Sequence, residues 1–401
     1  MSARGIVYLV GAGPGDPGLL TLRALELIRS AEVIAHDELI SPEILALVPR
    51  RAELLAVGRR HGRGKIDYRV HPMVLERARA GRVVVRLKSG DPLIFGRGAE
   101  EAEELAEAGI PFEIVPGVSA ALGAAAYAGI PLTHRRHASR VTFLTGHRAE
   151  ANGEGSRETV VLYMAAHRLK ENLDRLIADG CDPSTPAAFI AAATTAEQLV
   201  ISGTVANLAD KVGPERRSAP ALVVVGSVVA LRDRILWLEK MPLRGRRVLV
   251  AMARPGASKI AARLRALGAQ VMESPGPSAN EPDDGAPPGS ASAQGTRARE
   301  DRSENGACER ELPELIVLSN SSAARRLLGG KDGKSLAAVP MLAVGPATEA
   351  AARLHGALNV MCLRADSIES AVSSTLRAFR KLDAFAPEPR ERAKEILRWL
   401  T

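Results

Sequence analysis

The chain has few cysteines and few aromatic residues, and both shortages narrow its class. Cys181, Cys308 and Cys362 are scattered through 401 residues. This odd set argues against a disulfide framework or a cysteine-ligated metal cluster and fits a reducing cytoplasm. Aromatic residues make up 3% of a chain that is 46% hydrophobic, so aliphatic residues must supply the core. No apolar run is long enough to span a bilayer and no signal-peptide pattern is seen, so we expect a cytoplasmic protein without a membrane partner.

The chain is basic, with a formal net charge of +8 and a pI of about 9.7. Nucleic-acid binding is one explanation of such a charge. The sequence shows no basic helix and no group of aromatic and basic residues on which bases would stack, so we expect no nucleic-acid partner. A basic cleft also concentrates small anions. We therefore favour a polyanionic small molecule as the substrate.

The stretch from Val83 to Gly98, VVVRLKSGDPLIFGRG, is the most informative motif. Its first residues predict a buried strand, and Ser89-Gly90-Asp91-Pro92 predicts a turn at the end of that strand. In an open α/β sheet, ligands bind at loops of this kind. Small residues there would let a flat ligand lie against the backbone. Asp91 can accept hydrogen bonds from a ligand or cap its own turn, and the sequence leaves both interpretations open.

Other strand patterns also end in small or polar residues. Residues 6–10 lead into Gly11-Ala-Gly-Pro-Gly-Asp16, where we expect Asp16 to cap a helix that has Pro17 at its first position. This loop lacks the third glycine of a dinucleotide-binding motif. Alternating strands and helices up to about residue 240 predict an α/β fold. The remaining motifs are the strand 31–36 before Asp37, the strand 112–115 before an alanine-rich helix, the turn 129–135 and the strand 141–147.

In their order and spacing, these motifs resemble those of the uroporphyrinogen-III C-methyltransferases, a branch of the tetrapyrrole methylase family, over roughly residues 4–240. The resemblance implies two α/β lobes, residues 1–116 and 117–242, with the cofactor in the cleft between them. It implies methyl transfer from S-adenosylmethionine to C2 and C7 of uroporphyrinogen III, giving precorrin-2 for siroheme or cobalamin. The carboxylates of this tetrapyrrole agree with the basic charge. The resemblance also implies a homodimer that needs no metal.

The resemblance implies catalytic roles at two positions. Asp37 matches the proposed proton acceptor of the family, and its ordinary alternative is the N-cap of a helix beginning near Leu39. Arg59 stands where the family usually has a lysine that is proposed as a proton donor. Arginine keeps its proton and is a poor general acid, so we expect Arg59 only to hold a substrate carboxylate. An altered second methylation is the alternative. His36 likewise replaces the family's usual tyrosine.

The binding residues that the resemblance implies are mostly small or apolar toward the cofactor and basic toward the substrate. Met164 offers a polarizable contact to the cofactor, or is an ordinary core methionine. The S-adenosylmethionine site should include Pro14, Ser89, Gly90, Asp91, Ile94, Ser119, Ala120, Met164 and Ala193. The contacts to substrate carboxylates should include Thr133, His134, Arg135 and Arg97.

Residues 243–401 predict a separate, smaller α/β domain. Within it, residues 276–311 are rich in Pro, Gly, Ser, Ala and charge, so we expect this insert to be disordered. The segments around it resemble about half of a uroporphyrinogen-III synthase; they are residues 246–250, 267–269, 317–322 and 343–348. Because a synthase holds its substrate between two lobes, we expect a degenerate appendage, with synthase activity as the alternative.

Several functions therefore stay open beside the methylation of uroporphyrinogen III. The chain could combine methylase and synthase activities. It could methylate a later precorrin, ribosomal RNA or diphthine with the same fold. It could also bind a tetrapyrrole without catalysis, an alternative suggested by Arg59 and His36. The runs 90–98 and 129–135 favour uroporphyrinogen III.

Overall fold

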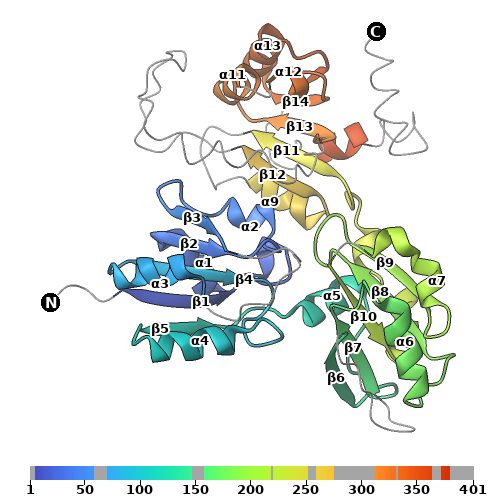
Figure 1. The fold of residues 1–401 in the computed structure, drawn as a ribbon. Helices are drawn as coiled ribbons and strands as arrows, with labels where there is room; N and C mark the ends of the chain where they lie inside the picture. The colour runs from blue at the N-terminus through green and yellow to red at the C-terminus, as the bar shows by residue number, and fades with distance from the viewer. Residues whose placement is uncertain are drawn as a thin grey trace. The chain divides into compact units, whose positions relative to one another are not determined.

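A computed structural model describes residues 5–57, 70–146, 158–217, 220–251, 259–274, 312–330, 333–363 and 372–379. The chain divides into two compact units, residues 1–240 and 241–401. Both are built of strands and helices, which confirms the predicted α/β class (Figure 1). The finer division at residue 116 remains a prediction, and the expected disordered insert 276–311 lies outside the described residues.

The first sheet of the N-terminal unit is parallel throughout, with the strand order β3-β2-β4-β1-β5 (Figure 1). All its strands therefore end at the same edge. Its strands are β1 (Ile6–Gly11), β2 (Val33–His36), β3 (Glu53–Ala56), β4 (Val83–Lys88) and β5 (Phe112–Val115). Its helices are η1 (Pro17–Leu19), α1 (Leu22–Ser30), α2 (Pro42–Leu45), α3 (Pro72–Arg79) and α4 (Gly98–Glu107).

The two faces of this sheet carry separate apolar cores, because successive side chains of a strand point to opposite faces. On β4, Val84 packs with residues of α3 and α4, whereas Val85 and Leu87 pack with residues of α1 and α2. The same alternation places Arg86 and Lys88 on the α4 side, although both are buried. One face of β4 thus changes from apolar to charged toward the end of the strand.

Two local predictions for this region need correction. Asp16 does cap a helical turn that has Pro17 at its first position, but the turn is the short 3₁₀ segment η1. The expected longer helix starts anew at Leu22, where the Thr21 side chain accepts a hydrogen bond from Ala24 N and serves as the N-cap. Asp37 does not cap a helix either, since Ser41 caps α2.

The second sheet is mixed, with the order β6-β7-β10-β8-β9. β6 and β7 are parallel, and β10 runs antiparallel to both β7 and β8, so β7 and β8 end at the same edge. Helix α5 packs on one face, and α6 with α7 on the other. The elements are α5 (Ala120–Ala128), β6 (Arg140–Thr145), β7 (Glu158–Tyr163), α6 (Leu169–Ala178), β8 (Pro186–Ala191), β9 (Leu199–Thr204), α7 (Leu208–Val212), η2 (Pro214–Arg216), β10 (Ala221–Val225), η3 (Ser227–Leu231), α8 (Arg232–Ile235) and η4 (Leu238–Lys240).

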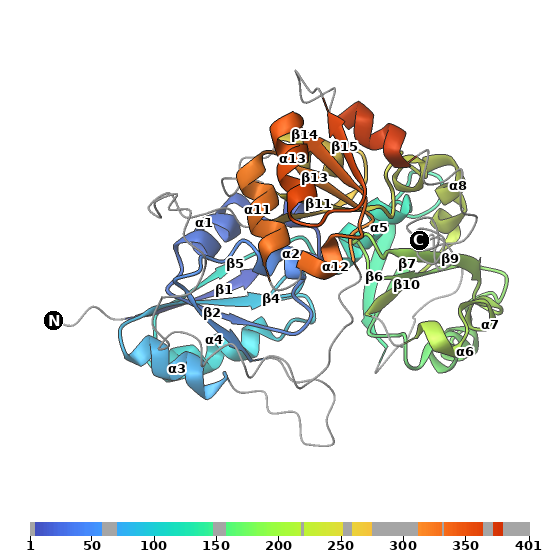
Figure 2. The same ribbon diagram turned by 90° about the horizontal axis from the view of Figure 1, so that it is seen from above.

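The C-terminal unit contains a parallel sheet with the order β12-β11-β13-β14-β15. Figure 2 labels β11, β13, β14 and β15 of this sheet. Helices α11, α12 and α13 contribute to the core on one face, and α9 with the helical residues 372–379 to the core on the other. Its elements are β11 (Arg247–Ala251), α9 (Lys259–Ala266), β12 (Gln270–Ser274), β13 (Leu315–Leu318), α11 (Ser321–Gly329), α12 (Gly333–Leu336), β14 (Met341–Val344), α13 (Pro346–Leu354) and β15 (Val360–Leu363).

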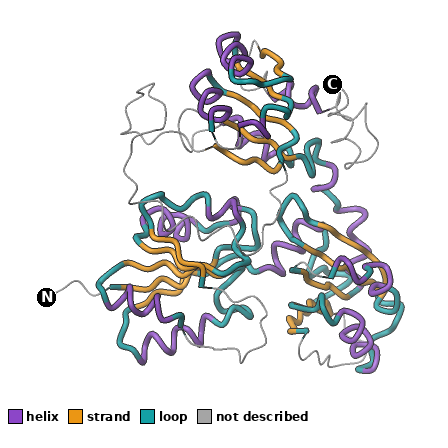
Figure 3. Tube along the Cα trace, turned by 45° about the horizontal axis from the view of Figure 1, so that its top comes forward, coloured by secondary structure: helices purple, strands orange, loops and turns teal. Residues whose placement is uncertain are grey.

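Strands and helices alternate along most of the chain, as Figure 3 shows. The helices are short, and in the described part of the chain none is both long and apolar enough to cross a membrane.

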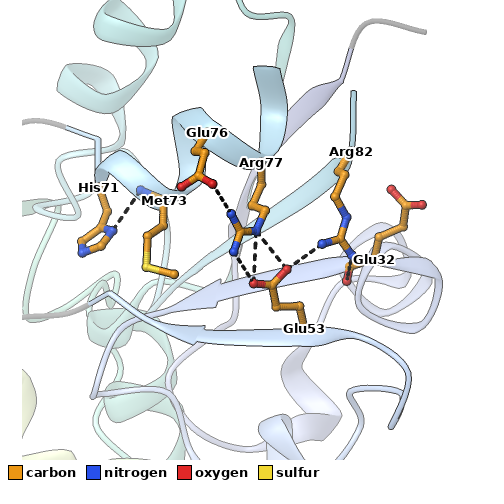
Figure 4. A network of polar contacts seen from close by, with 7 residues as sticks. All are labelled: Glu32, Glu53, His71, Met73, Glu76, Arg77 and Arg82. Carbon is orange, nitrogen blue, oxygen red and sulfur yellow. Dashed lines mark hydrogen bonds and ion pairs between the residues drawn. The ribbon is translucent and has the colours of Figure 1, made fainter. Parts of the chain in front are cut away.

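A polar network joins the elements at the amino ends of β2, β3 and β4 (Figure 4). Glu53, the first residue of β3, accepts hydrogen bonds from Arg77 Nη2 at 2.8 Å and from Arg82 Nη1 at 2.6 Å. Glu32, before β2, accepts a hydrogen bond from the backbone N–H of Val83 at 2.8 Å. The hydrogen bonds from Arg77 hold the pKa of the Glu53 carboxyl below its ordinary value, although partial burial opposes them.

We expect Glu53→Gln to lower the free energy of unfolding by about 1–3 kcal/mol at neutral pH, since it weakens bonds to two arginines. A carboxyl with a lowered pKa in the folded state stabilises above its unfolded pKa of about 4.3 and loses this contribution as the pH falls through the folded value. Urea denaturation of both proteins at several pH values would test this. A difference that is as large at about pH 2 as at pH 7 would contradict the role of the charge.

Candidate active site

The loops that follow β1, β4 and β5 meet through three glycines. A Cβ atom on Gly11 would lie 2.5 Å from Gly117 N and 2.8 Å from the carbonyl oxygen of Gly90. A Cβ atom on Gly117 would overlap that same carbonyl oxygen. Gly13 and Gly90 also exchange backbone hydrogen bonds of 3.1 and 2.8 Å. Only residues without a side chain permit this approach. It brings the predicted residues of the loop after β1 close to those of the loop after β4.

Asp91 ties the same loops together through its side chain. Its Oδ1 accepts a hydrogen bond from Leu93 N at 2.8 Å, and its Oδ2 accepts one from Gly117 N at 3.0 Å. The cap interpretation of Asp91 therefore describes its contacts within the protein. A carboxylate has about four lone-pair sites, so these two bonds leave capacity for a ligand donor.

A tyrosine connects this region to the second sheet. Tyr163, the last residue of β7, places its hydroxyl 2.6 Å from Ser119 Oγ and accepts a hydrogen bond from Ala121 N at 3.2 Å. Burial raises the pKa of Tyr163, so the phenol stays protonated. The ring of Phe95 packs against that of Tyr163, with 4.8 Å between centroids. The predicted residues Ser119 and Ala120 thus lie beside the strand end from which Met164 follows.

The loop after β1 also contacts the loop after β8. Asp16 N donates to Thr194 Oγ1 at 3.1 Å, and Tyr127 OH donates to Asp16 Oδ2 at 2.6 Å. A Cβ atom on Gly15 would lie 3.4 Å from the carbonyl oxygen of Ala193. Pro14 packs so closely on α5 that a Cβ atom at Gly123 would overlap its ring. Pro14 and Ala193, predicted from motifs far apart in the chain, are therefore neighbours.

Backbone strain is concentrated in these loops. Among the described residues, five other than glycine have a positive φ: Phe95, Arg97, Met164, Ala192 and Thr194, with values of 45–67°. Such conformations cost about 1–3 kcal/mol each and cluster at functional sites. Arg97 and Met164 are predicted site residues, and the other three are sequence neighbours of Ile94 or Ala193.

Large apolar side chains are exposed around the same loops. Leu93, Ile94, Phe95 and Met164 are 54%, 37%, 42% and 49% exposed. Apolar surface of this kind can cover the faces of a flat organic ligand. The exposure of Met164 argues against the alternative that it is an ordinary core methionine.

The predicted substrate residues are less tightly connected. Thr133 and Arg135 are exposed, and the His134 ring lies 4.9 Å from that of His137. His137 in turn lies 3.2 Å from Ser227 Oγ, which connects this turn to η3. Arg97 is exposed at the N-cap position of α4. These side chains are accessible to an anion, and the structure does not tie them into one cluster.

Asp37 follows β2 at the edge where the strands end, and its side chain is 27% exposed. Its Oδ1 accepts a hydrogen bond from Arg86 Nη2 at 2.5 Å. The same Nη2 lies 3.2 Å from Glu101 Oε1, to which Lys88 Nζ donates at 2.6 Å. His36 Nδ1 lies 3.0 Å from the backbone oxygen of Asp37. Arg59 lies outside the described residues.

Arg86, Lys88 and Glu101 are not among the site residues predicted from the sequence. A signal was present, because Arg86 and Lys88 interrupt an otherwise apolar strand at a spacing of two residues. Charges on one face of a buried strand need partners. The sequence does not show which carboxylates those partners are.

The chain thus has the parallel α/β fold and the glycine-rich loop edge of a small-molecule enzyme. The family model of the tetrapyrrole (corrin/porphyrin) methylases matches residues 6–209, just over half of the chain. The protein therefore belongs to the tetrapyrrole methylase family, as its motifs predicted. The match ends before the C-terminal unit.

Individual relatives agree with this assignment. A siroheme synthase of Pseudomonas paraeruginosa is 49% identical over 245 residues, which are 59% of this chain and 53% of that protein. Siroheme synthase 2 of Aeromonas hydrophila is 49% identical over 242 residues, or 58% and 51% of the two chains. The chain spans about half the length of these curated relatives. A crystal structure of uroporphyrin-III C-methyltransferase from Thermus thermophilus is 42% identical, with a TM-score of 0.50; the match covers 58% of this chain and 99% of that one.

We expect Gly117→Ala to lower the free energy of unfolding by about 1–3 kcal/mol, because its methyl group would overlap the carbonyl oxygen of Gly90. Gly329→Ala is the control, since a Cβ atom there meets nothing within 4 Å and alanine favours the helix α11. Chemical denaturation would compare them. A Gly117→Ala protein as stable as wild type would show that the loops can separate without loss.

Proposed function

We propose that this protein transfers methyl groups from S-adenosylmethionine to C2 and C7 of uroporphyrinogen III and so forms precorrin-2. Membership of the tetrapyrrole methylases supports a methyl transfer to a tetrapyrrole. The Thermus thermophilus enzyme, matched over nearly its whole length, supports this particular substrate. The observation that carries the proposal is the meeting of the loops after β1, β4, β5 and β8, which brings together predicted cofactor residues from separate motifs.

The residues of these loops suit S-adenosylmethionine. A Cβ atom on Gly90 would lie 3.3 Å from Ala120 N, so the absence of a side chain lets these backbone groups lie close to one another. Asp91 can accept a hydrogen bond from a ribose hydroxyl or from the ammonium group. Ile94 and Met164 offer exposed apolar contacts to the adenosyl part. Ser89 and Ser119 add hydroxyl groups at the turns.

The substrate side of the proposal depends on charge. Uroporphyrinogen III is a polyanion, and the chain has a net charge of +8. Arg97 and Arg135 are exposed and can pair with its carboxylates, together with Thr133 and His134. Arg59 is proposed to supply positive charge in the same way.

In the proposed reaction, an electron-rich pyrrole carbon attacks the sulfonium methyl group in line. The new carbon–carbon bond forms as the sulfur–carbon bond breaks, and the sulfur keeps the electron pair to give S-adenosylhomocysteine. The methylated ring then loses a proton, for which Asp37 is the proposed acceptor. The main contribution of the protein is to orient the two reactants and exclude water.

We further infer a homodimer that uses no metal, as its family resemblance implies. From the cysteine content, the apolar runs and the charge pattern of the sequence, we infer a cytoplasmic protein without a nucleic-acid or membrane partner. Synthase activity of residues 241–401 is the second candidate, supported by the expected resemblance and by the five-stranded parallel sheet of that unit. Adding hydroxymethylbilane and measuring the type III product would separate a bifunctional enzyme from a methylase with an appendage.

We expect two successive gains of one methyl group when the protein is incubated anaerobically with uroporphyrinogen III and S-adenosylmethionine and the products are followed by mass.

Asp37→Asn should reduce turnover by about 100-fold or more and leave S-adenosylmethionine affinity unchanged. Glu53→Gln, at the opposite edge of the first sheet, is the control. Tight S-adenosylmethionine binding without methylation by the wild type would redirect the search to another substrate of this fold.

Arg59→Lys should keep or increase the rate of both methylations, because lysine retains the positive charge and adds a group able to donate a proton. The rates of the first and second methyl gains are measured separately from the product masses. A large loss in either step would show that the enzyme uses the guanidinium group specifically.

A further inference from the structure

Four charged side chains form an alternating chain beneath the edge at which the first sheet ends. Lys88 bonds to Glu101 at 2.6 Å, Glu101 lies 3.2 Å from Arg86, and Arg86 bonds to Asp37 at 2.5 Å. The side chains of Lys88, Arg86 and Glu101 are 4%, 9% and 12% exposed. Asp37, at 27%, is the end of the chain that solvent reaches most. We call these residues the charged quartet.

Stability alone gives a weak reason for the charged quartet. Removing charges from water is costly, and a buried ion pair contributes no more stability than well-packed apolar residues of similar volume. The neighbouring positions of β4 show that apolar residues fit, since Val84, Val85 and Leu87 are fully buried there. Burial lowers the pKa of Lys88, and the nearby Arg86 charge lowers it further. The charges occur only where the strand approaches Asp37.

The contacts indicate how the quartet acts on Asp37. Arg86 is held at several points, since its Nη1 donates to the backbone oxygen of Leu87 at 3.0 Å while Nη2 is shared by Asp37 and Glu101. Glu101 is itself fixed by Lys88. Its other oxygen, Oε2, is buried without a hydrogen-bond partner among the described residues. One carboxylate oxygen of Glu101 is thus buried without a partner in the described part of the chain, while the other contacts the Arg86 guanidinium that bonds to Asp37.

We propose that Glu101 is a positioning residue that, through Arg86 and with the support of Lys88, fixes the Asp37 carboxylate in the orientation needed for proton transfer. The proposal rests on the proposed function of Asp37 in methyl transfer. Glu101 does not touch the substrate in this scheme. Its effect should appear in kcat rather than in the binding of S-adenosylmethionine.

The first variant is Glu101→Gln in the full chain. It keeps the shape of the side chain and removes the charge that Arg86 and Lys88 share. We expect kcat for uroporphyrinogen III methylation to fall by about 10- to 100-fold, the loss typical of a misplaced catalytic group. The KM for S-adenosylmethionine should stay within about twofold of the wild-type value. Glu53→Gln is the matched control, since Glu53 lies on a strand of this sheet and also bonds to two basic side chains, and the kcat of this variant should not change.

A second variant separates positioning from folding. In Lys88→Met/Glu101→Gln both charges of the buried pair are removed, so the midpoint of thermal unfolding should recover relative to Glu101→Gln. Activity should not recover, because Arg86 still lacks the charged acceptor at position 101. Recovery of kcat together with stability would overturn the proposal, as would an unchanged kcat in Glu101→Gln. If Glu101→Gln does not fold, the double variant alone gives the same comparison with the wild type.

A further measurement tests the positioning role of Glu101 independently of the proposed function. If the wild type does not methylate uroporphyrinogen III, that function is wrong, and crystal structures of the wild type and Glu101→Gln then decide the positioning role. We expect the Arg86–Asp37 contact to lengthen or break in the variant. A contact of unchanged length and geometry would overturn the proposal.

Discussion

The candidate site depends on the close approach of three backbone segments at Gly11, Gly90 and Gly117. A side chain on Gly11 or Gly117 would overlap the neighbouring loop, so the loops after β1, β4 and β5 could not share one edge of the sheet. Asp91 then bonds across the gap to Gly117 N. With these loops in place, Tyr163 and Thr194 can connect the second sheet to the same region. The candidate ligand site thus depends on the contacts that the small residues of these loops make with one another.

The two edges of the first sheet use similar charges for different purposes. At the amino edge, Glu53 bonds to Arg77 and Arg82 on the protein surface and joins a helix to strands (Figure 4). At the carboxyl edge, Glu101 bonds to Arg86 and Lys88 in the interior, where charge is far more costly. A parallel sheet presents its ligand-binding loops only at the carboxyl edge. The costly charges therefore lie on the side of the sheet where chemistry is expected.

Much of the local structure followed from the sequence, with informative exceptions. Strands such as β1 and β13 lie where apolar runs predicted them, because a buried parallel strand needs a continuous apolar segment. The helix predicted from Pro17 forms with Asp16 as its cap but ends after a short 3₁₀ turn, since Thr21 provides a second cap from which α1 starts. The cap interpretation of Asp37 was wrong, because Ser41 occupies that position and Asp37 bonds to Arg86 instead. In both cases a second residue nearby also had the side chain of a helix cap, and the sequence alone did not show where the longer helix would begin.

The sequence by itself determined the family, the α/β class and the motifs that contribute to the site, because apolar period, turn residues and glycine positions are local properties. Only the tertiary structure decided the strand order, the proximity of Pro14 to Ala193 and the partners of Arg86. Arg86 meets Asp37 from 49 residues away and Glu101 from 15 residues away. Buried charges need partners, but a strand pattern does not specify which carboxylates those partners are. Chain topology and packing specify them by bringing β2, β4 and α4 to one edge.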